Sequence, residues 1–233
     1  MSVKVQIYIG AGNHRDALMC ARAGADFIGF AADQTLINDV DYTGGTLPTL
    51  DQIGEIFQSL PTSVSKVALS FSTDPEEVAA MIEKVKPDIV HLAGKNKIAI
   101  SDIAHIKHDG GHRVKILQAI AVNLPDAIDT AQSYSRVCDY YLLDSKGDDS
   151  DHPYGIGATG EAHDWKISAE LVKRVNIPII LAGGLHQHNV AEAIRVVKPW
   201  GVDSFTLTNI EPTQASRKDP NKVAAFINAA RPK

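Results

Sequence analysis

The stretch IPIILAGGLHQHNVAEAI, residues 177–194, combines a short apolar run, a pair of glycines and the beginning of an amphipathic segment. An apolar run of this length that stops at glycines is typical of a buried strand, and the spacing of the apolar residues that follow predicts a helix. A strand, a tight loop and a helix in this order form one unit of a parallel α/β fold.

The same alternation occurs along the whole chain. Amphipathic spacing predicts helices at 14–24, 74–86, 124–135 and 187–198, and a last helix with Asp219 as N-cap and Pro220 in its first turn. Eight parallel strands joined by helices close a (β/α)₈ barrel, which is the fold class that we predict, with an open doubly wound sheet as the alternative. The predicted strands are 3–9, 26–32, 64–71, 88–93, 113–122, 139–144, 177–183 and 202–208.

The composition limits the kind of protein. A chain of 233 residues with 44% hydrophobic and 22% charged residues can form one barrel domain over 1–233. No segment approaches the roughly 18 uninterrupted apolar residues of a membrane span, and no export signal is recognisable at the start. With a formal charge of −5 and no Lys/Arg cluster, we expect neither a membrane nor a nucleic-acid partner. Cys20 and Cys138 fit buried thiols of a cytoplasmic protein.

The opening glycines lie where such barrels commonly bind phosphate. The loops after strands 7 and 8 of a barrel present backbone N–H groups at its carboxyl-terminal face. Gly183 and Gly184 lack side chains that would keep a phosphate from this backbone. Alternatively, the pair only makes a tight turn between strand and helix.

Further segments carry a resemblance to a known family. DALMCARAGADFIGF (16–30) and DPEEV with KPDIVHLAG (74–78 and 86–94) lie in the first half of the chain. YLLDS (141–145), GATGEAHDW (157–165) and NIEPTQASRKDPNKVAAFINAAR (209–231) lie in the second half. Together with residues 178–194, they resemble the phosphoribosylanthranilate isomerases of tryptophan biosynthesis. The resemblance implies a ribulose-phosphate-binding barrel, with phosphate held by Gly183, Gly184, Thr208, Asn209 and Ile210.

The resemblance also implies a reaction and its acid. The family performs an Amadori rearrangement, in which a ring-opened aminoaldose becomes an aminoketose through an enolamine. This chemistry needs a general acid and a base that removes the proton from C2, and no cofactor. The family's acid is an aspartate at the end of strand 6, which corresponds to Asp144. A carboxylate there can alternatively cap the next segment.

The family's base, a cysteine in a Lys-Ile-Cys-Gly motif at the end of strand 1, is missing. The chain reads QIYIGAGN over residues 6–13, so that either Ile9 or Tyr8 takes the position of the cysteine. Neither side chain is a base near neutral pH. His91, near the end of strand 4, and Asp33, after strand 2, are candidate replacements, and His14 is a weaker one.

The part of the site that binds the aromatic acid departs as well. The family has an arginine after strand 2, but no arginine occurs between Arg22 and Arg113. The loop 33–50 carries Asp33, Asp39 and Asp41 instead, and Glu161 replaces a family lysine. Negative charge repels a carboxylate. We therefore expect a phosphosugar ligand and negligible turnover of phosphoribosylanthranilate itself.

The loop 145–165 is long, polar and rich in glycine, as expected of a lid over substrate that includes Gly157, Thr159 and Gly160. Its histidine, His163, and the pair His186 and His188 match no established zinc spacing, so we expect no metal. Two other functions stay open. One is a phosphosugar-binding or regulatory barrel without activity, and the other is an aldolase or lyase that uses Lys146. A homodimer is also compatible with the resemblance.

Overall fold

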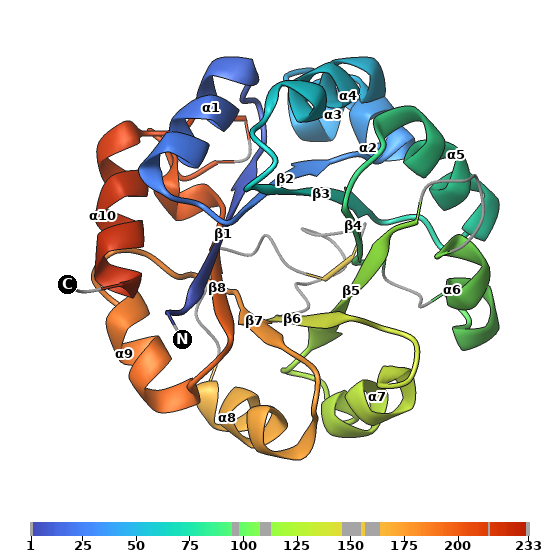
Figure 1. Ribbon diagram of the computed structural model, residues 1–233, viewed down its shortest axis with the longest axis vertical. Coiled ribbons are helices and arrows are strands. Elements are labelled where there is room, and N and C mark those ends of the chain that lie inside the picture. Colours follow the sequence, from blue (N-terminus) through green and yellow to red (C-terminus); the bar gives the residue numbers. More distant parts are fainter. Residues whose placement is uncertain are drawn as a thin grey trace.

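In the computed structural model, which describes residues 2–94, 98–107, 113–145, 155–156, 164–213 and 215–231, parallel strands close into a barrel. The strands pair in sequence order and β1 pairs with β8, as Figure 1 shows in a view along the barrel. The predicted closed barrel is confirmed, and the open sheet is not formed. The strands are β1 (Lys4–Ile9), β2 (Phe27–Ala31), β3 (Ser65–Ser70), β4 (Ile89–Leu92), β5 (Lys115–Ala121), β6 (Tyr140–Asp144), β7 (Ile179–Leu181) and β8 (Gly201–Ser204).

A ring of helices surrounds the barrel (Figure 1). The helices are α1 (His14–Ala23), α2 (Gln34–Asn38), α3 (Val40–Thr43), α4 (Leu50–Ser59), α5 (Pro75–Val85), α6 (Ile100–Ile106), α7 (Ala127–Tyr134), α8 (Trp165–Arg174), α9 (Val190–Val197) and α10 (Pro220–Ala230). Asp219 caps α10 as predicted, because its carboxylate accepts hydrogen bonds from the backbone N–H groups of Asn221 and Lys222. Among the described residues, no helix has the length and apolar character needed to cross a bilayer.

The end of β8 differs from the prediction. The strand was expected over 202–208, but it stops at Ser204 and a short 3₁₀ helix, η2 (Thr206–Thr208), follows. The alternation of Phe205 and Leu207 with polar residues imitates a strand. Lys218 explains the turn, because its ammonium group donates to the Phe205 carbonyl oxygen at 2.7 Å and to Thr208 Oγ1 at 2.8 Å. These bonds draw the two ends of the turn together.

The two ends of the barrel interior differ in polarity. At the amino-terminal end, the rings of Tyr140 and Trp200 stack at 5.3 Å, and Phe27 meets the ring of Trp200 edge-on at 5.6 Å. Apolar side chains from other strands fill the middle of the barrel. Polar groups, including His91, are found toward the carboxyl-terminal end, where enzymes of this fold place their sites.

Candidate active site

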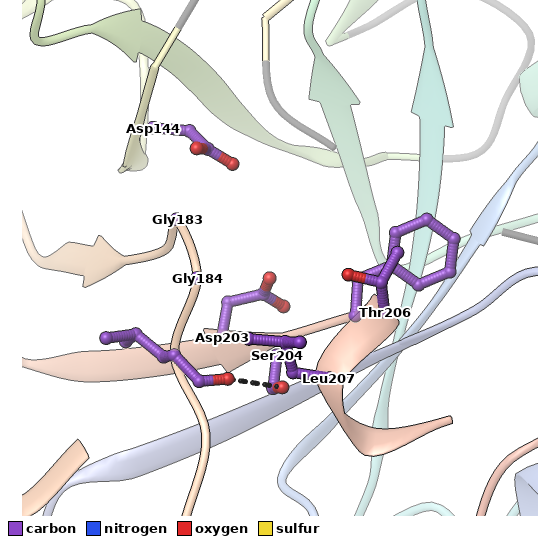
Figure 2. Close-up of a pocket in the computed structure, with 9 residues that line it drawn as sticks. Asp144, Gly183, Gly184, Asp203, Ser204, Thr206 and Leu207 are labelled. Atoms are coloured by element: carbon purple, nitrogen blue, oxygen red, sulfur yellow. Dashed lines mark hydrogen bonds between the residues drawn. The ribbon is translucent and has the colours of Figure 1, made fainter. Parts of the chain in front are cut away.

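Two aspartates from neighbouring parts of the barrel face one cavity. Asp144 is the last residue of β6 and Asp203 lies in β8, and both side chains are buried. Figure 2 shows both carboxyl groups directed into the space beside Gly183 and Gly184. The Ser145 backbone N–H donates to Asp144 Oδ1 at 2.7 Å and holds the Asp144 carboxyl in place.

Burial makes both carboxyl groups weak acids. It raises the pKa of Asp144 to about 7, against the hydrogen bond from the Ser145 N–H. It also raises the pKa of Asp203 to about 8, and the charge of Asp144 adds to this shift. Because each charge disfavours the other, the pair holds one proton near neutral pH. A pair with one proton contains both a proton donor and a proton acceptor.

The loop after β7 forms the wall of this cavity. Gly183 and Gly184 have φ angles of 83° and 60°, in the left-handed region that favours glycine. Ser204 Oγ donates to the Leu185 carbonyl oxygen at 2.9 Å, the dashed line in Figure 2, and so ties this loop to the end of β8. The opposite wall is the segment Ser204 to Leu207. The cavity therefore presents backbone from two loops, as a phosphate site does.

The residues after β8 that the sequence predicts to bind phosphate lie one turn beyond the cavity. Thr208 and Asn209 are fully buried, and Ile210 is 58% exposed at the surface. Thr208 Oγ1 bonds to Lys218, and Asn209 Nδ2 donates to the Thr213 carbonyl oxygen at 2.7 Å. None of the three lines the cavity beside Gly183, because the 3₁₀ turn brings residues 204–207 there instead.

A buried lysine lies behind this turn. Lys218 is 3% exposed, and burial lowers its pKa to about 7, although the charges of Cys20, Asp203 and Asp16 oppose the shift. Its ammonium group also lies over the Phe205 ring, 5.4 Å from the centroid. In its protonated form, Lys218 thus brings positive charge close to the backbone of the segment Ser204 to Leu207, which forms one wall of the cavity.

Tyr8 takes the interior position at the end of β1. Its hydroxyl lies 2.6 Å from His91 Nδ1, whereas Ile9 packs in the layer between strands and helices. The Tyr8 ring fits because Gly29 is opposite it in β2, where a β-carbon would lie 2.3 Å from Tyr8 Cε1. Both residues that the resemblance offers for the place of the cysteine, Tyr8 and Ile9, line the apolar cavity at this end of the barrel.

Neither Tyr8 nor His91 has a pKa that suits a general base at neutral pH. Burial raises the pKa of Tyr8 well above its usual value, and the charge of Asp203 adds to the effect. Burial lowers the pKa of His91 to about 3, so the imidazole is neutral and weakly basic. The short Tyr8 to His91 hydrogen bond therefore joins two uncharged groups.

Asp33 has a structural environment. One of its oxygens accepts the Leu36 N–H at 3.1 Å as the cap of α2. The other accepts the N–H groups of Phe71 and Ser72 at 2.8 and 3.0 Å, and the Ser70 hydroxyl at 3.2 Å. Asp33 therefore holds the loops after β2 and β3 together and does not line the cavities of Asp144.

His14 opens α1 and lines a different cavity, formed with residues 11–13 and 46–48. Gly157, Thr159 and Gly160 of the expected lid, together with Lys146, Glu161 and His163, lie outside the described residues. Within the described part of the chain, no three His, Cys, Asp or Glu side chains form a metal-binding group. Cys20 and Cys138 are buried free thiols, as expected.

A second, mostly apolar cavity meets the first at the aspartate pair. Asp144, Asp203 and Phe205 line both cavities. A molecule that extends from the glycine loop into the apolar cavity would pass the two carboxyl groups. The other residues of the apolar cavity are Tyr8, Ile9, Gly10, Ala31, Leu36, Leu47, Leu69, Phe71, His91, Leu142 and Ile156.

Sequence reasoning missed Asp203 and Lys218. Asp203 lies inside the predicted strand 202–208, and a carboxylate within a barrel strand was the signal that could have revealed it. Lys218 lies in RKDP (217–220) directly before a helix cap, where a lysine is ordinarily exposed. Only the fold shows that this lysine is buried.

The closed barrel, with backbone from the β7 and β8 loops around one cavity, defines a (β/α)₈ barrel of the ribulose-phosphate-binding type. The family model of N-(5'-phosphoribosyl)anthranilate isomerase matches residues 50–229. The isomerase of Methanocella arvoryzae is 34% identical over 222 residues, with 95% of each chain covered. The chain thus belongs to the phosphoribosylanthranilate isomerase family.

Solved structures agree with this membership. One of them shows monomers generated from the dimeric phosphoribosylanthranilate isomerase of Thermotoga maritima. Its chain is 25% identical to this one, with a TM-score of 0.75 and 98% of each chain covered. Another phosphoribosylanthranilate isomerase, 24% identical, has the same TM-score of 0.75 and the same coverage of 98%. That protein was solved with reduced 1-(o-carboxyphenylamino)-1-deoxyribulose 5-phosphate.

Proposed function

We propose that this protein is an isomerase that converts an N-substituted aldosylamine 5-phosphate into the corresponding 1-amino-1-deoxyketose 5-phosphate. The observation that carries the proposal is the position of the Asp144 carboxyl, which lines both the cavity beside the glycine loop and the apolar cavity. A sugar phosphate with an apolar amine substituent would place its reacting carbons between the two. Family membership supports the same chemistry.

The phosphate is held mainly by backbone. Gly183 and Gly184 offer N–H groups that no side chain covers, and the first turn of η2 faces them across the cavity. The first N–H groups of a helical turn have no partner within the turn, so they are free for an anion. Lys218 adds charge from behind the turn. The phosphate contacts are the same in the ground state and in the transition state, so they contribute to substrate affinity and not to kcat.

Asp144 acts as the general acid. Its buried carboxyl, with a pKa of about 7, keeps a proton at neutral pH in a useful fraction of molecules. The proton passes to the ring oxygen of the sugar, the bond from that oxygen to C1 breaks, and an open-chain iminium forms. Loss of the C2 proton then gives the enolamine, which becomes the aminoketose when C1 takes a proton and the C2 hydroxyl loses one.

A direct assay tests this function. The protein is incubated in D₂O with a panel of N-aryl and N-alkyl ribosylamine 5-phosphates, including phosphoribosylanthranilate, and products are followed by NMR. We expect conversion of at least one member, with deuterium at C1 of the product wherever the abstracted proton exchanges with D₂O before C1 is protonated. If no member is converted and none exchanges a proton, the protein is a binding barrel and the proposal is wrong.

We also propose that the protein is a cytoplasmic homodimer. The Thermotoga maritima relative is described as dimeric, and two free buried thiols suit a reducing compartment. Light scattering of the purified protein should give twice the monomer mass of 25.1 kDa. A mass of one chain at micromolar concentration would contradict the dimer.

A further inference from the structure

We propose that Asp203 is the general base that removes the C2 proton, in place of the cysteine that the family carries on β1. The inference rests on the proposed isomerase function and assigns the residue that this function still lacks. Asp203 would touch the reacting carbon from the β8 side, while Asp144 serves the ring oxygen from the β6 side.

The topology puts Asp203 beside the missing cysteine. β8 is the strand next to β1, and Asp203 pairs in register with Gln6, two residues before Tyr8. Tyr8 is an interior residue at the end of β1, the strand on which the family carries its cysteine. A base on β8 therefore approaches the substrate from nearly the same side as a base on β1, across the cavity from Asp144 (Figure 2).

The other candidates have different environments. Tyr8 directs its hydroxyl to His91, and both groups are uncharged near neutral pH. Both oxygens of Asp33 accept hydrogen bonds from loops after β2 and β3. Cys20 is fully buried in the layer between strands and helices. Among the residues that the structure describes, Asp203 and Asp144 are the carboxyl groups that line the cavity of the substrate.

Asp203 itself has the character of an unused base. It is 7% exposed, and its Oδ1 atom has no hydrogen-bond partner within the described residues. The titratable groups that face it are Asp144, Tyr8 and Lys218. Burial and the charge of Asp144 raise its pKa to about 8, whereas a hydrogen bond with the Gln6 side chain and the charge of Lys218 oppose this shift. A buried carboxylate without full hydrogen bonding is more basic than one in water.

The proton transfers balance without any further reactant. The reactive state of the pair has its proton on Asp144, and it is the less populated of the two one-proton states, because the pKa of Asp203, about 8, lies above that of Asp144, about 7. In this state Asp144 gives its proton to the ring oxygen, and ionised Asp203 takes the proton from C2 of the iminium. The electron pair of that C–H bond forms the C1–C2 double bond, and the iminium nitrogen becomes neutral. Protonated Asp203 then delivers a proton to C1, the C2 hydroxyl returns one to Asp144, and both groups regain their starting states.

Two isosteric variants, Asp203→Asn and Asp144→Asn, test the assignment, with Asp139→Asn as the matched control. Asp139 precedes β6 at the opposite end of the barrel and binds Lys107. We expect Asp203→Asn to lower kcat roughly 10²–10⁴-fold with little change in affinity for the substrate, and the control to stay within about twofold. Circular dichroism checks that each variant is folded. Turnover of Asp203→Asn within threefold of the unmodified protein would overturn the inference.

The pH dependence of the residual rates separates base from acid. In Asp144→Asn the remaining group is the base, so the residual rate should rise with pH until Asp203 is ionised. In Asp203→Asn the remaining group is the acid, so the residual rate should fall as Asp144 loses its proton. If instead the residual rate of Asp144→Asn fell with pH and that of Asp203→Asn rose, Asp144 would be the base and Asp203 the acid. That result would overturn the inference while leaving the isomerase function intact. An unmodified protein that neither converts nor exchanges any substrate would overturn both.

Discussion

The β7 and β8 loops and the interior ends of β1 and β4 lie at the same end of the barrel, but they relate differently to the family. The loops form the two walls of one cavity, in which Gly183 and Gly184 face the turn at 204–207, and we propose that this cavity binds phosphate. The strand ends hold Tyr8 and His91 as an uncharged, hydrogen-bonded pair, whereas the family resemblance leads us to expect a reactive thiol on β1. The contrast separates what a fold supplies through its backbone from what it supplies through one side chain.

The physical reason lies in how each function is made. An anion site of backbone N–H groups depends on loop conformation, and here Ser204 and Lys218 maintain that conformation by bonding to carbonyl oxygens. Most side-chain substitutions leave such a site intact. Proton abstraction depends on one group of suitable pKa, so the loss of that group ends the activity unless another acidic group faces the substrate. The aspartate pair is such a replacement.

The largest effect expected is that of Asp144→Asn. The amide has nearly the shape of the acid but cannot deliver a proton to the ring oxygen. We expect kcat to fall roughly 10²–10⁴-fold while affinity for the phosphosugar changes little, because the acid acts in the transition state. Steady-state kinetics and direct binding by calorimetry measure the two quantities. Equal losses in both would place Asp144 in ground-state binding instead.

The second effect concerns the substrate's carboxylate. The apolar cavity ends at Asp144 and Asp203, and no lysine or arginine from the described residues lines it. We expect kcat/KM for the N-phenyl ribosylamine 5-phosphate to exceed that for phosphoribosylanthranilate, which adds a carboxylate, by about tenfold or more, or roughly 1.4 kcal/mol. Robust turnover of phosphoribosylanthranilate, or rescue of a tryptophan auxotroph at normal expression, would show that the carboxylate site has been kept.

A third change, Gly184→Val, addresses the phosphate loop. A β-branched residue at a φ of 60° is strained and brings its side chain against the backbone that receives the anion. We expect affinity for a phosphosugar to fall at least tenfold, about 1.4 kcal/mol. Gly24→Val is the control, since Gly24 has a φ of 104° at the end of α1, far from the site. An equal loss in both variants would indicate general destabilisation, so the corresponding alanine pair would be compared as well.

The smallest effect expected is on stability. The folded-state pKa of Asp203, about 8, lies above the ordinary value near 3.9, so the folded protein binds the proton more tightly. Stability from this group is present below pH 4 and is lost as the pH rises toward 8. Asp203→Asn should therefore raise the Tm by several degrees at pH 8.5, at roughly 2–4 °C per kcal/mol, and much less at pH 5. A difference in Tm that stays constant from pH 5 to pH 8.5 would contradict the raised pKa of Asp203 in the folded protein.

The sequence was sufficient for the architecture and for part of the site. Repeated strand and helix patterns predicted the barrel, and YLLD placed Asp144 at the end of β6. The end of β8 was predicted wrongly, because the alternation of Phe205 and Leu207 looks like a strand and only Lys218, distant in sequence, enforces the turn. Because of that error we expected residues 208–210 beside the glycine loop, whereas residues 204–207 line the cavity there.

The environments of titratable groups were also beyond the sequence. Asp33 and His91 are plausible bases by residue type, yet hydrogen bonds occupy one and burial neutralises the other. Asp203 acquires its character from burial beside a second carboxyl across the barrel. Register between neighbouring strands, which a single sequence leaves open, decides which side chains meet in the interior.

The central claim is that a retained phosphate loop and an aspartate pair act on the same substrate. A crystal structure with a reduced, open-chain 1-amino-1-deoxyketose 5-phosphate tests it most directly. We predict phosphate oxygens within hydrogen-bond distance of the backbone N–H groups of Gly184 and the 204–207 turn. We also predict that C1 and C2 lie between the carboxyl groups of Asp144 and Asp203, with the amine substituent in the apolar cavity. A phosphate bound elsewhere, or a carbon chain that turns away from both carboxyl groups, would contradict the account.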